Sequence, residues 1–312
     1  MDIATVMATV MPMDTNNLHQ DDPPAMISRT YTIAGTCFKV FCPEMWMYRD
    51  DGALHAFRTQ DTTADHTLVF SLVEELAPPE GICVYRQPDK HVYIYGDTQI
   101  RYTGSVDQSL SGAYMRASRC GNSSSIQVRR NSLRGHITSK VVLTAMEMEH
   151  HIAQKGGFLL HASYIGWNNR AILFTAPSGV GKSTQAALWE NLRGARLLNG
   201  DRAAVAVENG QVFVHGIPFS GSSGVAENVT LPLAAIVYLS QAPMTRITRL
   251  SGVKAFRSIW EGCSINLWNK EDVVLCTESV LHTAETIPVY HLACTPDESA
   301  VTALEQELTK QR

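Results

Sequence analysis

The segment from residue 171 to residue 189 constrains the fold of this chain more than any other, and it reads AILFTAPSGVGKSTQAALW. The apolar residues Ala171 to Phe174 predict a buried strand. Ala176 to Ser183 predict a loop that contains two glycines, and Thr184 to Leu192 have the composition of a helix. Strand, glycine-containing loop and helix follow one another in the order of a P-loop, so we expect an α/β unit here.

This loop has the chemistry to bind phosphate. Loop N–H groups and the N-terminus of the following helix, which carries about half a positive charge, converge on phosphate oxygens. Gly179 and Gly181 allow backbone angles and a close approach that a side chain would block. Lys182 can neutralise the β and γ phosphates, and the Ser183 hydroxyl can join the shell of Mg²⁺. We predict a site for ATP and Mg²⁺ whose binding residues are Pro177, Ser178, Gly179, Val180, Gly181, Lys182, Ser183 and Thr184.

The loop departs from the usual pattern at one position, because the first glycine of the motif is Ala176 here. The alternative interpretation is that a Gly-Lys-Ser-Thr run occurs by chance in a turn. The flanking strand and helix favour nucleotide binding.

Two further residues fall near the loop by geometry. A hairpin that pairs Ile165 with Ala171 puts His161 opposite Thr175, beside the mouth of the loop. A helix to Arg193 runs about 15 Å away from the phosphates. A strand from residue 195 to residue 200 can return roughly 16 to 20 Å, which brings Asp201 back to the level of the loop.

Both residues have a structural alternative. Asp201 can bind Mg²⁺ or accept a proton from an attacking hydroxyl, but it could also be an ordinary turn residue of Asn199 to Arg202. His161 lies among apolar neighbours, where a histidine is more often a hydrogen-bonded core residue. Their common position at one end of one sheet favours a functional role for both.

The stretch LLHASYIGWNNRAILFTAPSGVGKSTQAALWENLRGARLLNGDRAAV resembles the catalytic core of HPr kinase/phosphorylase and its kinase relatives, which share a fold with phosphoenolpyruvate carboxykinase. The resemblance covers residues 158 to 225 well and the remainder weakly. It implies that His161 is the catalytic histidine, Lys182 the phosphate lysine, Ser183 the Mg²⁺ hydroxyl and Asp201 the catalytic aspartate.

Two departures from that family matter for the chemistry. Its members carry two adjacent acidic residues where this chain has Gly200 and Asp201, and a Glu where it has Thr184. The lost carboxylate argues against the phosphorylase half of the family's chemistry. The segment from His215 to Gly221 is similar to one in related kinases found beside peptide-modification genes, a group that includes lasso-peptide kinases.

The chain divides near residue 135. Strands are predicted at Tyr31 to Val40 and in four shorter runs, 67–72, 81–86, 91–95 and 126–128. Residues 103 to 125 are rich in Ser and Gly and predict a long loop. Val141, Ala145, Met148 and Ile152 predict one amphipathic helix, and Val301, Leu304 and Leu308 predict a last helix capped by Asp297. We therefore expect a flexible tail over 1–27, a mostly-β domain over 28–134, and an α/β (α+β) P-loop domain over 135–312. By resemblance, this last domain is like that of HPr kinase and phosphoenolpyruvate carboxykinase.

Composition bounds the partners. A net charge of -4 disfavours nucleic acid, since binding its phosphates requires a basic surface. Seven cysteines without paired spacing indicate a reduced chain, and no Cys or His spacing supports a structural metal. The apolar run Leu231 to Leu239 is too short for a membrane helix, so we expect a soluble, cytoplasmic protein without a membrane partner.

The leading hypothesis is an ATP-dependent kinase that phosphorylates a hydroxyl of a peptide, a protein or a small molecule. Extra positive charge could come from arginines at 202, 246, 249 and 257, although each is more often a surface residue. A P-loop ATPase is disfavoured because Ala235 to Ser240 ends without the expected acidic residue, and a nucleotide-sensing module is the third reading. A carboxykinase is less favoured still, because no set of basic residues suits a small dicarboxylate.

The segment Met45 to Tyr48 is suited to a core or to a docking surface, and the core is favoured. Resemblance to HPr kinase allows a homo-oligomer.

Overall fold

A computed structural model describes residues 25–44, 52–61, 63–105, 110–132 and 137–310. Residue contacts divide the chain into two units whose main boundary lies between Met146 and Glu147. Two short segments, Ile33–Gly35 and Ala53–Phe57, group with the second unit. Residues 1–24 of the expected tail and the segment Met45 to Tyr48 lie outside the described residues. The tail was expected to extend to residue 27, but Met26 and Ile27 begin the first strand.

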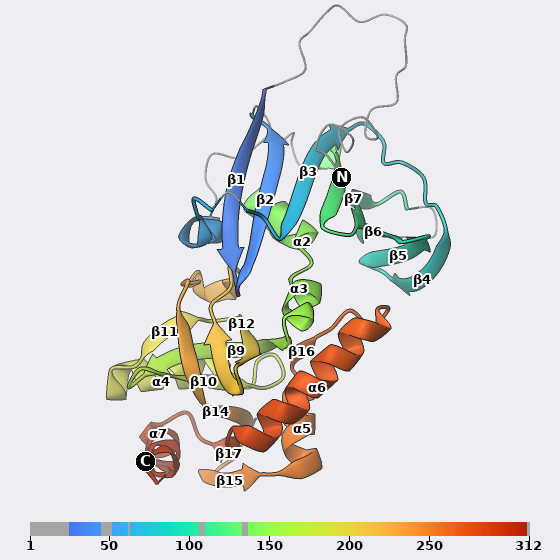
Figure 1. The fold of residues 1–312 in the computed structure, drawn as a ribbon. Helices are drawn as coiled ribbons and strands as arrows, with labels where there is room; N and C mark the ends of the chain where they lie inside the picture. Colours follow the sequence, from blue (N-terminus) through green and yellow to red (C-terminus); the bar gives the residue numbers. More distant parts are fainter. Residues whose placement is uncertain (1–24, 45–51, 62, 106–109, 133–136, 311–312) are drawn as a thin grey trace, which may run out of the picture. The chain divides into compact units, whose positions relative to one another are not determined.

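The first unit is built on an eight-stranded sheet with the order β1-β2-β3-β8-β7-β6-β5-β4 (Figure 1). Its elements are β1 (Met26–Ile33), β2 (Thr36–Pro43), β3 (His66–Val73), β4 (Ile82–Gln87), β5 (Lys90–Tyr95), β6 (Thr98–Gly104), β7 (Ala113–Cys120), β8 (Ser123–Arg129) and the helix α2 (Ser139–Ala145). Strand β3 runs parallel to both of its neighbours, and β4 to β8 form antiparallel pairs.

Two expectations for the strands of this unit were wrong, and a third was wrong for the helix near residue 145. The run from Tyr31 to Val40 is two strands, because Ala34 and Gly35 adopt positive φ angles of 47° and 73° and reverse the chain. The supposed loop over residues 103 to 125 contains β7, in which every second residue from Ala113 to Ala117 is buried. Tyr114, Arg116 and Ser118 occupy the other face, and the two polar residues hide the alternation.

The single helix expected near residue 145 is two helices, α2 and α3 (Met148–Gln154). Glu147 between them has a φ of 47°, a left-handed conformation that a continuous helix cannot contain. Met148 and Ile152 are buried in α3, as Val141 and Ala145 are in α2, so the apolar spacing identified buried positions but not the break.

The second unit is built on a nine-stranded sheet, ordered β10-β9-β12-β13-β14-β17-β15, with β11 and β16 paired to β9. Its remaining elements are β9 (Gly157–Trp167), β10 (Arg170–Thr175), α4 (Lys182–Arg193), β11 (Arg196–Asn199), β12 (Arg202–Glu208), β13 (Gln211–His215), β14 (Thr230–Gln241), β15 (Arg246–Leu250), α5 (Gly252–Trp260), β16 (Cys263–Ser264), α6 (Lys270–Thr286), β17 (Val289–Cys294) and α7 (Glu298–Thr309). Strands β10, β14 and β17 run parallel, and β14 pairs with both β13 and β10.

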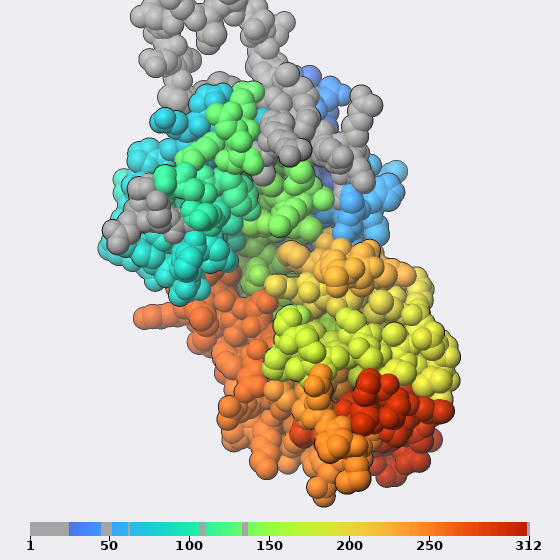
Figure 2. Space-filling model, turned by 180° about the vertical axis from the view of Figure 1, so that it is seen from behind, coloured from blue at the N-terminus to red at the C-terminus, as the bar shows by residue number. Residues whose placement is uncertain are grey.

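Helices cover both faces of the three parallel strands. On β10, Ile172 and Phe174 point to one face, in a core that includes Trp189 of α4 and Leu304 of α7. Leu173 points to the other face, in a core with residues of α5 and α6. Figure 2 shows α7, in red, against yellow-green and yellow segments of the same unit. The buried strand at 171–174 and the last helix, whose N-terminus is capped by the Asp297 carboxylate, are confirmed.

Candidate active site

The phosphate loop joins β10 to α4 at the carboxyl end of the parallel strands, the edge where open α/β sheets bind ligands. Gly179 and Gly181 have φ angles of 80° and 129°, so the backbone conformation itself requires glycine at both positions. No heavy atom lies within 4 Å of where their Cβ atoms would stand, and this leaves the loop open to a ligand.

Ala176, the departure from the usual motif, is a core residue. It is 8% exposed and packs with Phe174, Ala186 and Trp189 beneath the loop. Its φ is not positive, so this position does not require glycine. The substitution therefore adds apolar contact without straining the loop.

Lys182 lies across the inside of the loop. Its side chain is buried, and Nζ donates hydrogen bonds to the Ala176 oxygen at 3.0 Å and to the Pro177 oxygen at 3.4 Å. Burial lowers the pKa of Lys182, and the nearby Asp201 carboxylate opposes that shift. Phosphate oxygens would offer this ammonium stronger, charged acceptors than the two carbonyls.

Ser183 and Thr184 are exposed in the first turn of α4, so both hydroxyls can reach a ligand in the loop. Among the described residues, no group of three or more His, Cys, Asp or Glu side chains could hold a metal ion. Mg²⁺ fits such a site because it is commonly held by one or two protein oxygens, substrate phosphates and water. Ser183 and Asp201 supply oxygens of that type.

His161 and Asp201 come together beside this loop. The His161 Nε2 and Asp201 Oδ1 atoms are 4.0 Å apart, and Arg202 Nε lies 3.4 Å from the other carboxylate oxygen of Asp201. Both His161 and Asp201 are partly exposed, with 39% and 31% of their side chains accessible. Lys182 and Asp201 each act electrostatically on His161. The structure thus brings together three residues that are far apart in the sequence.

The imidazole of His161 is uncharged at neutral pH. Burial lowers its pKa below the usual value, Lys182 and Arg202 lower it further, and Asp201 acts in the opposite direction. A neutral imidazole has one donor and one acceptor nitrogen, so it can either donate to a phosphate oxygen or accept from a hydroxyl.

The predicted hairpin register was wrong by one residue. Ile165 pairs with Ile172, and Thr175 pairs with Ala162 instead of His161. The cause is a two-residue turn at Asn168 and Asn169, whose φ angles of 50° and 58° are those of a type I′ hairpin turn. His161 still lies at the loop, because the Thr175 hydroxyl donates to its carbonyl at 3.0 Å.

The turn that carries Asp201 is fixed by a residue that sequence reasoning missed. Asn199 is fully buried, and its Oδ1 accepts the backbone N–H groups of Asp201 and Arg202 at 2.9 and 3.0 Å. Its amide nitrogen donates to the Ile217 carbonyl at 2.8 Å. The signal was present in the Asn-Gly-Asp sequence, since Asn commonly bonds to the backbone two residues ahead.

Gly200 is enclosed by the segment that follows His215. A Cβ on Gly200 would lie 2.6 Å from Ser223 Cβ, and a Cβ on Gly221 would lie 2.8 Å from Asp201 Cβ. The 3₁₀ turn at Gly221–Ser223 therefore packs directly on the Asp201 turn. A second carboxylate cannot enter at position 200 unless Ser223 moves.

Of the four arginines considered, Arg202 lies at the site. Arg246 and Arg249 are exposed on β15, and Arg257 pairs on the surface with Glu261 at 2.7 Å.

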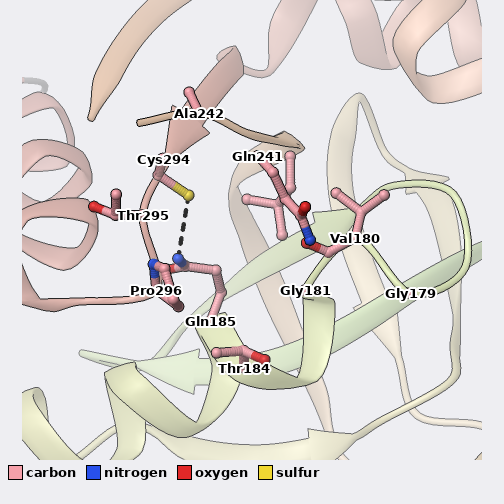
Figure 3. A pocket seen from close by; sticks show the side chains of 11 residues that line it. Gly179, Val180, Gly181, Thr184, Gln185, Gln241, Ala242, Cys294, Thr295 and Pro296 are labelled. Atoms are coloured by element: carbon pink, nitrogen blue, oxygen red, sulfur yellow. Dashed lines mark hydrogen bonds between the residues drawn. The ribbon is translucent and has the colours of Figure 1, made fainter. Parts of the chain in front are cut away.

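Two cavities adjoin the ends of the phosphate loop. The first, which we call the loop cavity, has a volume of about 380 Å³ and lies between Gly179 to Gly181, Gln185 of α4, and Gln241 and Cys294 at the ends of β14 and β17 (Figure 3). Gln185 is 2% exposed; its amide nitrogen contacts Cys294 Sγ at 3.3 Å, and its Oε1 has no hydrogen-bond partner within the described residues.

The second, which we call the histidine cavity, has a volume of about 280 Å³. It lies between His161, the first loop residues Ala176 and Pro177, Tyr238 of β14, and the turn Glu261 to Ser264. Nothing in the sequence pattern pointed to Tyr238 or Glu261, because they reach the loop only through the packing of β14 and α5.

Together the sheet, the helices and this loop define a mixed α/β protein with a strand, glycine loop and helix of the P-loop type. The chain belongs to the family described as "SynChlorMet cassette protein ScmC", whose model matches residues 127–308. A comparison with curated proteins gave no match. Among solved structures, the chain is weakly similar to the Hpr(Ser) kinase/phosphatase from Coxiella burnetii, with 14% identity and a TM-score of 0.29, over 49% of this chain and 92% of that chain. No helix in the described part of the chain is long and apolar enough to span a membrane.

Proposed function

We propose that this protein is an ATP- and Mg²⁺-dependent kinase that transfers the γ-phosphate to a hydroxyl group of a peptide, a protein or a small molecule. The observation that carries the proposal is the meeting of His161, Lys182 and Asp201 at the phosphate loop. Phosphoryl transfer chiefly requires positioning and charge neutralisation, and these groups are suited to both.

Each residue has a role in this proposal. Lys182 and the loop N–H groups hold the phosphates, and Ser183 and Asp201 would hold Mg²⁺, which neutralises charge on the β and γ phosphates when bound. The acceptor oxygen forms a bond to the γ-phosphorus as the bond from phosphorus to the ADP oxygen breaks. Asp201 takes the proton of the acceptor hydroxyl, and the neutral His161 contacts either that hydroxyl or the γ-phosphate.

The test is transfer of labelled γ-phosphate to a panel of hydroxyl-bearing peptides and small molecules. We expect Lys182→Ala to lower the rate by about a hundredfold to a thousandfold, because the substitution removes the main positive charge that neutralises the phosphates. Lys254→Ala is the matched control, since Lys254 is an exposed lysine of α5. Equal transfer by the wild type and Lys182→Ala would overturn the proposal.

The second candidate is a nucleotide-binding module that does not transfer phosphate. The exclusion of a second acidic residue at Gly200 favours it, since related kinases have two. ATP binding without turnover on any acceptor would support this reading. A P-loop ATPase is less favoured because Ser240, near the end of β14, is not acidic; it is hydrogen-bonded to His291 at 2.8 Å.

A further inference from the structure

The histidine cavity adjoins the proposed site of phosphoryl transfer. It shares His161 and the first two loop residues with the proposed site, whereas the open glycines of the loop face the other cavity. Its volume of about 280 Å³ is below the usual range of ligand pockets, about 300 to 1,000 Å³. It has room for one side chain or a small molecule, and not for a whole nucleotide.

The outer wall of this cavity is fixed to the catalytic residues. The Gly262 carbonyl accepts the His161 N–H at 2.8 Å, and β16 pairs with β9 through Cys263 and Leu160. Arg202, the partner of Asp201, donates from Nη1 to Ser264 Oγ at 3.1 Å. The turn Glu261 to Ser264 is therefore held in register with both groups that would handle the acceptor.

Glu261 is placed to give this cavity a negative charge. The Tyr238 hydroxyl donates to its Oε2 at 3.3 Å. Burial and the carboxylate of Glu261 both raise the pKa of Tyr238, so the phenol remains a donor at neutral pH. Glu261 is the one acidic side chain among the described residues that line the cavity.

The existing partner of Glu261 leaves it open to a ligand. Arg257 contacts Oε1 at 2.7 Å from the solvent side, and its own side chain is 78% exposed. An exposed pair of this kind contributes little free energy, so a cation inside the cavity can compete for the carboxylate.

We propose that the histidine cavity is the acceptor subsite, and that it selects a hydroxyl compound with a positively charged nitrogen close to the hydroxyl. Glu261, oriented by Tyr238, binds the ammonium or guanidinium group, and the hydroxyl faces His161 and Asp201. An acidic acceptor is rejected by the same carboxylate. This inference rests on the proposed kinase function. The shared chemistry is that of a serine beside a basic residue in a peptide or of a free amino alcohol.

The test uses acceptors that differ only in charge, with the full chain, ATP and Mg²⁺. One set is the blocked hexapeptide Ala-Ala-Ser-X-Ala-Ala with X as Arg, Gln or Glu. The other set is ethanolamine, ethylene glycol and glycolate. We expect kcat/KM to fall from the cationic to the neutral to the anionic acceptor, with at least about a fivefold step between the first two. The set that responds identifies the peptide or the small molecule as the source of the hydroxyl.

Two variants tie the preference to the cavity. Glu261→Gln should remove it, so that cationic and neutral acceptors converge, and Tyr238→Phe should weaken it by leaving the carboxylate unoriented. Glu278→Gln makes the same chemical change at an exposed position of α6 and should keep the preference. Thermal unfolding of each variant identifies any loss of folding. No charge preference in the wild type, or an unchanged preference in Glu261→Gln, would overturn the inference.

Binding separates this inference from the kinase proposal. Calorimetry with the same acceptors and a non-hydrolysable ATP analogue measures the subsite even if no phosphate is transferred. Absence of transfer with Glu261-dependent binding of the cationic acceptors would contradict the kinase and support the subsite. Phosphate transfer without Glu261-dependent binding of the cationic acceptors would support the kinase and contradict the subsite.

Discussion

The two cavities at the phosphate loop are built from opposite chemistry. The loop cavity is lined by glycine backbone and by uncharged side chains such as Gln185, Gln241 and Cys294. The histidine cavity is lined by titratable groups, His161, Tyr238 and Glu261 among them. One short loop can therefore separate two tasks: its glycine-rich end suits the binding of a nucleotide, and its alanine-proline end adjoins the groups that can exchange protons.

The largest expected effect is that of Asp201→Asn, which should lower phosphate transfer without lowering nucleotide binding. Asp201→Asn keeps the shape of the turn but cannot take a proton, so we expect transfer to fall about a hundredfold to ten-thousandfold. Nucleotide affinity measured without Mg²⁺ should change by less than about threefold, because Lys182 and the loop are untouched. Nucleotide titration and labelled transfer measure the two quantities.

Asp89→Asn, at an exposed position of the first unit, controls for the loss of one charge. If Asp201→Asn loses Mg²⁺-free nucleotide binding as fully as transfer, the carboxylate is chiefly structural. The division of tasks between the two cavities would then be broken.

A second prediction concerns why the turn that carries Asp201 has one carboxylate. Gly200→Asp should lower the free energy of unfolding by about 1 to 3 kcal/mol, since its Cβ would meet Ser223. In Gly200→Asp with Ser223→Gly the collision is removed. Denaturant unfolding of both single variants and the double variant measures the coupling, and we expect it to be favourable by about 1 kcal/mol. Additive effects would show that position 200 is not restricted by the 3₁₀ turn.

Much of the fold followed from the sequence because it depends on local pattern. The apolar run of β10, the glycines of the loop and the Asp297 cap each act within a few residues, and the structure contains all three. The errors arose where conformation overrode pattern. Glu147 adopts a positive φ inside an apolar helical spacing, and the two-asparagine turn shifted the hairpin register.

The site divides in the same way. Lys182 and Ser183 belong to a contiguous motif, and Asp201 returned to the loop by simple arithmetic of helix and strand lengths. Glu261 could not be predicted, because its position depends on where α5 ends against β14. Gln185 could not be singled out either, since an unpartnered amide oxygen is a property of the packed structure.

Gln185 offers a test from the side of the loop cavity. Its buried Oε1 lacks a partner within the described residues, so a ligand donor such as a nucleobase amine or a ribose hydroxyl would satisfy it. Gln185→Leu should weaken nucleotide binding about fivefold, the size of one neutral hydrogen bond. Transfer at saturating nucleotide should keep its pH dependence. Gln306→Leu, at an exposed position of α7, is the control, and unchanged affinity in Gln185→Leu would mean that the ligand does not reach this amide.

The smallest expected effect concerns acid stability and belongs to the histidine cavity. Burial and the charges of Lys182 and Arg202 lower the pKa of His161 in the folded chain, whereas an unfolded histidine titrates near pH 6.5. The unfolded state therefore takes up this proton first, and stability falls as the pH drops from about 6.5 through the folded pKa. His161→Gln should flatten that part of the profile of unfolding midpoint against pH. His215, whose pKa is also lowered by burial, is present in both proteins, so its contribution cancels in the comparison. If the slope of unfolding midpoint against pH is unchanged between pH 7 and pH 5, His161 is not held neutral in the folded chain. The two cavities would then differ less in their titratable groups than we propose.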